Sequence, residues 1–297
     1  MPRPLALFAA LLLLLAGSTA ALAQDATPVG ALASLGYPEL KVTITDQAYE
    51  LSTQQIPAGL VLMTVVNASN DATGAAILGP PEGSTMQDLM TMAATPAADD
   101  QFPPFLFQAR ILGGPGDVAP GGSAQAVVNV PAGDWAVFGE GSQPPTMLTA
   151  TGGTPTAQSE PASTVTVTEM EMSFLGLDGP IPAGPQVWKV VNNGKQPHML
   201  VLGKVPDGTT LAQVLASMSL PENATPAPGM LQESDFQPAG GVLLQSSGTT
   251  VWPALDLAPG RYVALCFVTD PATGQPHVAL GMISLFDVGG AAATPSA

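Results

Sequence analysis

Short runs of apolar and β-branched residues recur along the chain, and glycine and proline separate them. Runs of this kind, bounded by turn residues, are typical of β-strands joined by tight turns. In the first half the pattern predicts strands at 41–45, 60–67, 75–79, 124–130 and 134–139. In the second half it predicts strands at 164–168, 186–192, 199–205, 249–257, 261–268 and 281–288. The chain is therefore expected to be all-β, an antiparallel Greek-key sandwich.

One short helix is expected after the third strand of each half. Thr85 and Asp88, like Thr210 and Gln213, have the spacing of a helix capping box. Apolar residues then repeat at helical intervals in both places. Low contents of aromatic residues, 5%, and of charged residues, 10%, argue against a helical bundle.

The chain contains an internal duplication. At an offset of 125, "IPAG" and "VVN" of 56–85 coincide with the same letters in 181–210. At an offset of 127, "VPAGDWAVFGEG" meets "LAPGRYVALCFV". Two tandem domains of one fold are therefore expected. We expect their bounds at 24–148 and 163–288, with a flexible linker at 149–162 and a disordered tail at 289–297.

The N-terminal segment 1–23 has the layout of a cleavable secretory signal. Arg3 precedes an apolar stretch, and Ala-Leu-Ala stands directly before Gln24. The stretch is too short to span a bilayer comfortably, and no later segment approaches a membrane span, so stable membrane insertion is not expected. Because no cysteine lies near the cleavage point, a lipid anchor is not expected either. We therefore expect a secreted or periplasmic protein.

The net charge of −16 excludes nucleic acid as a partner, because nucleic-acid binding requires clustered lysine and arginine. Such acidity favours solubility of an exported protein over a docking face for a basic partner, which stays open as the alternative.

Scarce side chains that can bind a metal gather in the second copy. The chain has two histidines, His198 and His277, and one cysteine, Cys266, and all three lie in the second copy. Thr73 and Gly139 stand at the positions of His198 and Cys266 in the first copy, where the third segment has no histidine. A purely structural need would be shared by both copies, so this asymmetry predicts a metal site in one of them.

Copper suits this set of side chains best. Two imidazoles and a thiolate with a weak axial thioether, which Met282 would supply, form the arrangement of mononuclear copper centres that transfer electrons. Zinc also accepts histidine and cysteine, but its structural sites usually recruit a fourth strong ligand. Calcium and magnesium prefer oxygen donors.

The stretches "VVNNGKQPH" and "PGRYVALC", followed by His277 and by "GM" at 281–282, resemble the cupredoxins, the plastocyanin and azurin family of blue copper proteins. The resemblance covers roughly 163–288. It implies copper as the cofactor, His198, Cys266 and His277 as equatorial ligands and Met282 as the axial ligand. The first copy resembles the fold without its site.

One departure from the family pattern concerns the spacing between the cysteine and the second histidine. Ten residues separate Cys266 from His277, more than in small cupredoxins. The insert contains Asp270-Pro271, Gly274 and Pro276, which predict a turn that returns His277 to the cysteine. His277 and Met282 differ by an odd number, so they can converge only from a loop, which Gly281 permits.

Three functions follow as hypotheses. The first is a one-electron carrier that holds copper in its second domain and exchanges electrons with a redox partner protein that the sequence does not identify. The second is a metal-free binding or scaffold module, or a copper carrier or storage protein. The third is a copper enzyme, which is not expected because such enzymes need further histidines and this chain has none to spare.

Overall fold

The computed structural model describes residues 32–93, 102–139, 143–152, 159–220, 226–227 and 229–289. The expected signal segment, 1–23, and residues 290–297 of the expected tail lie outside these ranges. No helix within the described ranges is long and apolar enough to cross a lipid bilayer.

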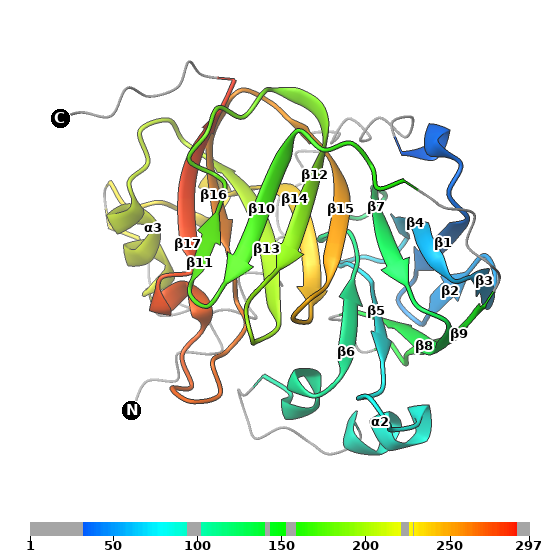
Figure 1. The fold of residues 1–297 in the computed structure, drawn as a ribbon. Helices are drawn as coiled ribbons and strands as arrows, with labels where there is room; N and C mark the ends of the chain where they lie inside the picture. Colours follow the sequence, from blue (N-terminus) through cyan, green and yellow to red (C-terminus); the bar gives the residue numbers. More distant parts are fainter. Residues whose placement is uncertain are drawn as a thin grey trace.

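Strands make up nearly all of the regular structure, as the apolar runs predict (Figure 1). The first copy contains β1 (Glu39–Ile44), β2 (Tyr49–Leu51), β3 (Gln55–Pro57), β4 (Gly59–Asn67), β5 (Ala76–Gly79), β6 (Arg110–Gly113), β7 (Ser123–Val130), β8 (Gly133–Phe138) and β9 (Thr146–Thr151). The second copy contains β10 (Val165–Met170), β11 (Ser173–Leu175), β12 (Gly184–Asn192), β13 (His198–Val205), β14 (Gln237–Gln245), β15 (Thr250–Leu257), β16 (Gly260–Leu265) and β17 (Ile283–Val288).

Helices are short and few. Within the described residues the α-helices are α2 (Met86–Ala93) and α3 (Leu211–Met218), one in each copy. The capping boxes form as predicted: Thr210 Oγ1 accepts from the Gln213 backbone N–H, and Gln213 Oε1 accepts from the Thr210 N–H. The 3-10 helices are η2 (Ala33–Leu35), η3 (Pro104–Phe107), η4 (Glu233–Asp235) and η5 (His277–Leu280).

Two large sheets run through both copies. The strand order of the first sheet is β11-β10-β12-β15-β7-β4-β1-β2, and that of the second is β17-β16-β13-β14-β6-β5-β8-β9-β3. Buried side chains of both sheets, such as Val42 and Val61 from the first and Ile77 and Leu200 from the second, belong to one hydrophobic core. The all-β class and the duplicated two-sheet architecture with one short α-helix per copy are thus confirmed.

The copies are joined edge to edge. Strand β15 pairs with β7 in the first sheet, and Gln245 of β14 pairs with Leu112 of β6 in the second. The Ser246 hydroxyl accepts from the Ile111 N–H at 2.9 Å and donates to the Ala109 carbonyl at 3.1 Å. Strand β9 continues to Thr151, so the segment expected to be a linker begins as paired strand, and its residues 153–158 lie outside the described ranges.

The expectation of purely antiparallel sheets is wrong. Strand β1 pairs in parallel with β4, β10 with β12, and β3 with β9. In each copy the chain turns back after its first strand into a short antiparallel partner, β2 or β11, before the next long strand begins. That extra reversal brings the next long strand back in the direction of the first.

A buried asparagine at the end of the second long strand fixes the following loop in each copy. The Asn192 side chain donates to the carbonyls of Gln196 and Gln245 at 2.9 and 3.0 Å and accepts from the Gly194 N–H at 2.9 Å. Asn67, at the same position of the first copy, makes three equivalent bonds. This loop precedes His198, so Asn192 also supports the start of β13.

Replacing Asn192 by alanine should lower the free energy of unfolding by about 2–4 kcal/mol, because three buried backbone groups lose their partner. Urea unfolding of the metal-free protein measures the change. Asn193→Ala is the matched control, since Asn193 is the exposed neighbour, and it should stay within about 0.5 kcal/mol of the parent protein. Equal stabilities of the two variants would contradict the proposed role of Asn192.

Candidate metal centre

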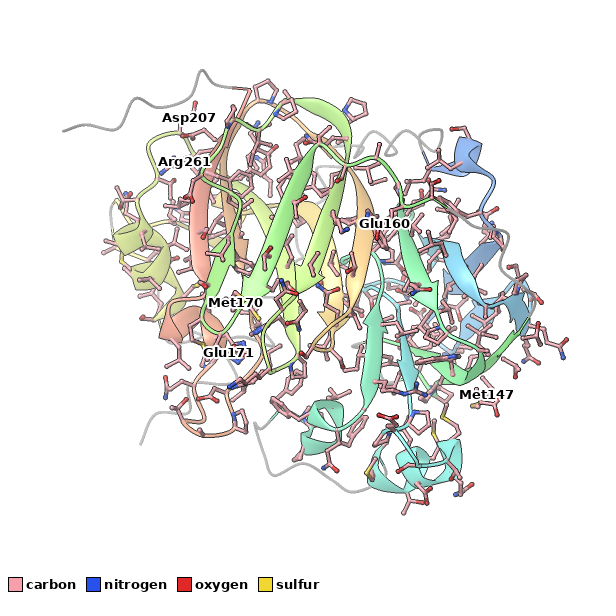
Figure 2. The ribbon with its side chains drawn as sticks, in the orientation of Figure 1. Met147, Glu160, Met170, Glu171, Asp207 and Arg261 are labelled. Carbon is pink, nitrogen blue, oxygen red and sulfur yellow. The ribbon has the colours of Figure 1, made fainter. Side chains whose placement is uncertain are left out.

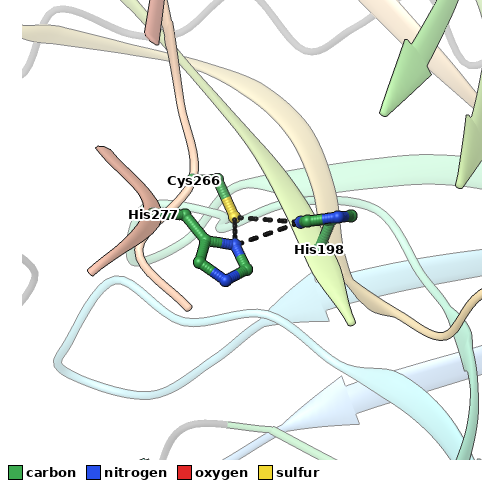
Figure 3. A group of neighbouring side chains, drawn as sticks. All are labelled: His198, Cys266 and His277. Atoms are coloured by element: carbon green, nitrogen blue, oxygen red, sulfur yellow. Dashed lines mark hydrogen bonds between the residues drawn. The ribbon is translucent and has the colours of Figure 1, made fainter. Parts of the chain in front are cut away.

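The three predicted equatorial ligands converge at one end of the second copy (Figure 3). His198 is the first residue of β13, Cys266 directly follows the last residue of β16, and His277 is the first residue of η5. Strands β13 and β16 are antiparallel neighbours, with Val201 opposite Leu265. The start of one strand and the end of the other therefore lie side by side, and all three side chains are fully buried.

The three donor atoms form a compact triangle. His198 Nδ1 lies 3.1 Å from His277 Nδ1, and Cys266 Sγ lies 3.9 and 3.5 Å from these two nitrogens, respectively. From these sides, the point equidistant from the three atoms is about 2.0 Å from each, close to the length of a metal–imidazole bond. The side chains are thus arranged as a three-donor site for one ion.

The insert between Cys266 and His277 folds back as predicted. The Asp270 N–H donates to the Gln275 carbonyl and the His277 N–H donates to the Val268 carbonyl, both at 2.8 Å. The Val278 N–H donates to the Cys266 carbonyl, also at 2.8 Å. The insert is therefore a closed turn, and its two ends are bonded next to the thiol. His277 stands in a 3-10 helix rather than in the loop that the sequence suggested.

Hydrogen bonds assign the tautomer of His277. The Asp270 carboxylate can only accept, so the amide nitrogen of Gln196 faces it, at 3.0 Å. The amide oxygen of Gln196 consequently faces His277 Nε2, at 3.0 Å, and must accept a hydrogen bond from the Nε2–H group. His277 Nδ1 then carries a free lone pair directed at the cluster. Gln196 and Asp270 act here as the outer partners that orient a metal-binding imidazole.

His198 has a different setting. Its Nε2 is buried without a hydrogen-bond partner and lies 3.9 Å from Glu171 Oε1. The same carboxylate oxygen accepts from the backbone N–H groups of Lys195 and Gln196 and so holds the preceding loop. Figure 2 shows Glu171 at this end of the second copy. With His277 Nδ1 unprotonated, the 3.1 Å contact in the metal-free protein requires His198 Nδ1–H to donate.

Burial sets the protonation states of the metal-free cluster. Burial lowers the pKa of His198 to about 4, and the neighbouring His277 lowers it further. Burial also lowers the pKa of His277 to about 4, although the negative charges of Asp270 and Glu171 oppose this shift. Burial also raises the pKa of the Cys266 thiol to about 12. At neutral pH the cluster therefore holds neutral imidazoles and a protonated thiol, and a cation that binds there must displace the thiol proton.

Met282 lies in the buried core next to this cluster. Its N–H donates to the His277 carbonyl at 2.8 Å, and its carbonyl accepts from the Cys266 N–H at 3.3 Å. Gly281, with φ of 110°, makes the turn that places it there. The backbone thus brings Met282 beside two of the three donors, and its role as axial ligand stays a prediction.

The corresponding place in the first copy is closed. A Cβ atom at Gly139, the counterpart of Cys266, would lie 2.2 Å from the Gly74 carbonyl oxygen and 2.7 Å from the Tyr49 hydroxyl. A cysteine cannot be accommodated there unless the backbone moves. Thr73 stands at the position of His198. The first copy therefore has neither of these two ligands, and neighbouring atoms occupy the space that the cysteine side chain would need.

Five supporting residues were not identified from the sequence: Glu169, Glu171, Gln196, Gln245 and Asp270. A signal existed for Glu169, because Val165, Val167 and Glu169 alternate toward one face of a strand. Its carboxyl is fully buried, accepts from Gln245 Nε2 at 2.6 Å, and has a pKa raised to about 7 by burial. Gln245 acts from the end of a strand, and the other three act through loop contacts that no periodicity reveals.

No protein-family model matches the chain, and no curated protein matches it. Among solved structures it is similar to Na-dithionite-reduced auracyanin from the photosynthetic bacterium Roseiflexus castenholzii, with 24% identity, coverage of 43% of this chain and 98% of that one, and a TM-score of 0.26. Auracyanin A, a "blue" copper protein of Chloroflexus aurantiacus, is 22% identical over 41% of this chain and 98% of its own, with a TM-score of 0.26.

The copper-containing nitrite reductase of Thermus scotoductus is 11% identical over 84% of this chain and 61% of its own, with a TM-score of 0.24. One of these neighbours, auracyanin A, is named as a "blue" copper protein, the class that the sequence resembles. The likenesses are too low to support an argument about the site, which therefore rests on the geometry of its own donor atoms.

The two buried histidines should make the metal-free protein sensitive to acid. Their pKa values lie at about 4 in the folded protein and near 6.5 when unfolded, so the unfolded chain binds protons first as the pH falls. Stability from this source is complete above about pH 6.5 and is lost toward pH 4, on the order of 3 kcal/mol for each histidine. Urea unfolding with a chelator at both pH values measures it.

The control for this measurement is the double variant His198→Gln/His277→Gln, which retains the carboxylates but lacks both imidazoles. Its stability should fall less between the two pH values. An identical fall in the double variant would show that other groups produce the acid sensitivity.

Proposed function

We propose that the protein is a copper-binding one-electron carrier, with the ion held by His198, Cys266 and His277 and with Met282 as the axial ligand. The convergence of three buried donor atoms within 3.9 Å of one another carries the proposal. Copper, when bound, supplies a one-electron couple, and a redox partner protein delivers and removes the electron.

The donor set supports copper over other ions. A thiolate with two imidazoles suits soft or borderline ions, and this excludes calcium and magnesium as good fits. The cluster contains three histidine or cysteine donors among the described residues, whereas structural zinc sites have four strong ligands. The thioether sulfur of a methionine such as Met282 is a weak ligand that copper accepts.

The surrounding protein supports electron transfer over delivery or storage of the ion. His277 is held through Gln196 and Asp270, and His198 by the loop that Glu171 and Asn192 fix. Ligands held in this way move little between oxidation states, and a delivery protein would instead need an exposed ligand from which to release the ion. Gln196 is half-buried and bonded to His277, so it offers electrons a route between the surface and the site.

A metal-free scaffold is the weaker alternative. Burying two imidazoles and a thiol at one point, with His198 Nε2 left without a hydrogen-bond partner, is unfavourable for a fold that makes no use of them. The first copy has the same fold without such a cluster. Location outside the cytoplasm, expected from residues 1–23, belongs to the same proposal.

Adding cupric ion to the purified metal-free protein should give one bound copper per chain and an intense visible charge-transfer band from the thiolate. Cys266→Ser should abolish the band and weaken copper binding by more than the 10–100-fold typical of losing an outer partner of a ligand. Absorption spectroscopy and copper analysis after dialysis measure both effects.

The matched control is Ser217→Ala, a substitution of similar size in α3, which should leave the band and the stoichiometry unchanged. A parent protein that shows no band and retains no copper would overturn the proposal.

Met282→Leu should keep the charge-transfer band but raise the reduction potential, because loss of a donor withdraws electron density from the metal and favours its reduced state. We expect about a tenfold change in the equilibrium with a redox mediator, which is 59 mV for one electron. Met218→Leu, which changes a buried methionine of a separate apolar cluster, is the control. An unchanged potential in Met282→Leu would remove Met282 from the ligand set.

A further inference from the structure

A buried polar pair, Glu169 and Gln245, connects the two sheets beneath the candidate metal centre. Glu169 lies on β10 of the first sheet and Gln245 ends β14 of the second, and both are 0% exposed. Glu169 Oε2 accepts from Gln245 Nε2 at 2.6 Å, while Glu169 Oε1 is buried without a hydrogen-bond partner.

The duplicated fold shows what occupies these positions when no cluster is present. Glu169 pairs with Asn192, and in the first copy Ile44 pairs with Asn67, the counterpart of Asn192. Gln245 pairs with His198, and in the first copy Val118 pairs with Thr73, the counterpart of His198. Strand register therefore equates Glu169 with Ile44 and Gln245 with Val118, which are both buried and apolar.

The fold itself consequently does not need a polar pair at this place. A buried ion or carboxyl is unfavourable compared with well-packed apolar side chains of similar volume. Only the copy with the His-Cys-His cluster carries the pair, so the pair and the cluster occur together. This points to a role of the carboxyl at the cluster rather than in stability.

Glu169 is close enough to the cluster to act on it electrostatically. Gln245, its partner, lies directly opposite His198 in the ladder between β13 and β14. Burial raises the pKa of the Cys266 thiol, and the charge of Glu169 raises it further. A carboxylate in this dry interior is poorly screened, so its field at the metal position is strong.

Resting on the proposed function, we propose that Glu169, oriented by Gln245, is the counter-charge that sets the reduction potential of the metal centre. Two neutral imidazoles and one thiolate around a divalent copper ion leave one positive charge, and one-electron reduction removes it without breaking a bond. A nearby negative charge stabilises the oxidised state and lowers the potential. Glu169 is thus a positioning and tuning residue that does not touch the metal.

Glu169→Gln is the test, because it removes the charge and keeps the shape and an oxygen that can accept from Gln245. Potentiometric titration of the copper-loaded protein at pH 8.5 should show at least a tenfold shift of the mediator equilibrium toward the reduced protein, or 59 mV. The position of the charge-transfer band should stay the same, since the ligands are unchanged.

Glu160→Gln is the matched control for loss of one charge. Glu160 is 58% exposed and bonded to Lys189 at 2.6 Å, near the start of β10 rather than its end, and Figure 2 shows it well away from Glu171. Solvent and salt screen such a charge, so the mediator equilibrium should change by less than about twofold.

The double variant Glu169→Ile/Gln245→Val gives the second copy the apolar pair of the first and protects the test against misfolding of a single variant. It should bind copper, show a raised potential like that of Glu169→Gln, and unfold without copper at the same or higher urea concentration than the parent.

The outcomes separate this inference from the proposed function. Copper binding with an unchanged potential in both variants overturns the inference alone. A changed charge-transfer band in Glu169→Gln also overturns it, because the pair would then hold the ligands rather than tune them. Absence of copper binding by the parent protein would overturn the proposed function itself.

Discussion

The candidate metal centre depends on the burial of three electron-rich atoms against one another. Two imidazole nitrogens and a thiol sulfur meet within 3.9 Å, away from water. Burial keeps the imidazoles neutral and the thiol protonated, so hydrogen bonds alone link the three side chains in the metal-free protein. A cation at their centre would satisfy all three. The surrounding hydrogen bonds, from Gln196 to His277 and from Glu171 to the loop before His198, hold the donors in place for it.

The duplication provides an internal comparison within one chain. Asn67 and Asn192 make equivalent bonds, so the loop they fix belongs to the fold. His198 and Cys266 are replaced by Thr73 and Gly139, and the space of a cysteine side chain is taken by the Tyr49 hydroxyl and a carbonyl. At this place the copies differ both in the ligand positions and in the groups that support them. Continuous sheets join the two copies, and the first copy contacts the second at Ser246, next to Gln245.

Much of this could be predicted from the sequence. The strand pattern, the two helices with their caps and the convergence of His198, Cys266 and His277 follow from residue type, spacing and the repeat. The parallel pairing of β1 with β4 and of β10 with β12 was missed, because apolar alternation does not encode the direction of a partner strand. The joining of β6 to β14 also depends on contacts between distant segments.

The supporting residues show the same limit. Glu169 could have been identified, since it continues the inward-facing series of Val165 and Val167. Gln196 and Asp270 could not, because their contacts with His277 arise only when two loops meet. Residues that bind an ion are scarce and chemically distinctive, whereas those that orient them are common polar residues.

X-ray absorption at the copper edge of the loaded, full-length protein tests the central claim most directly, because it reports which atoms surround the ion. The account predicts two nitrogen donors and one sulfur donor with a short copper–sulfur bond, and loss of that sulfur in Cys266→Ser. A coordination shell of nitrogen and oxygen alone would show that the ion binds elsewhere on the protein and would contradict the account.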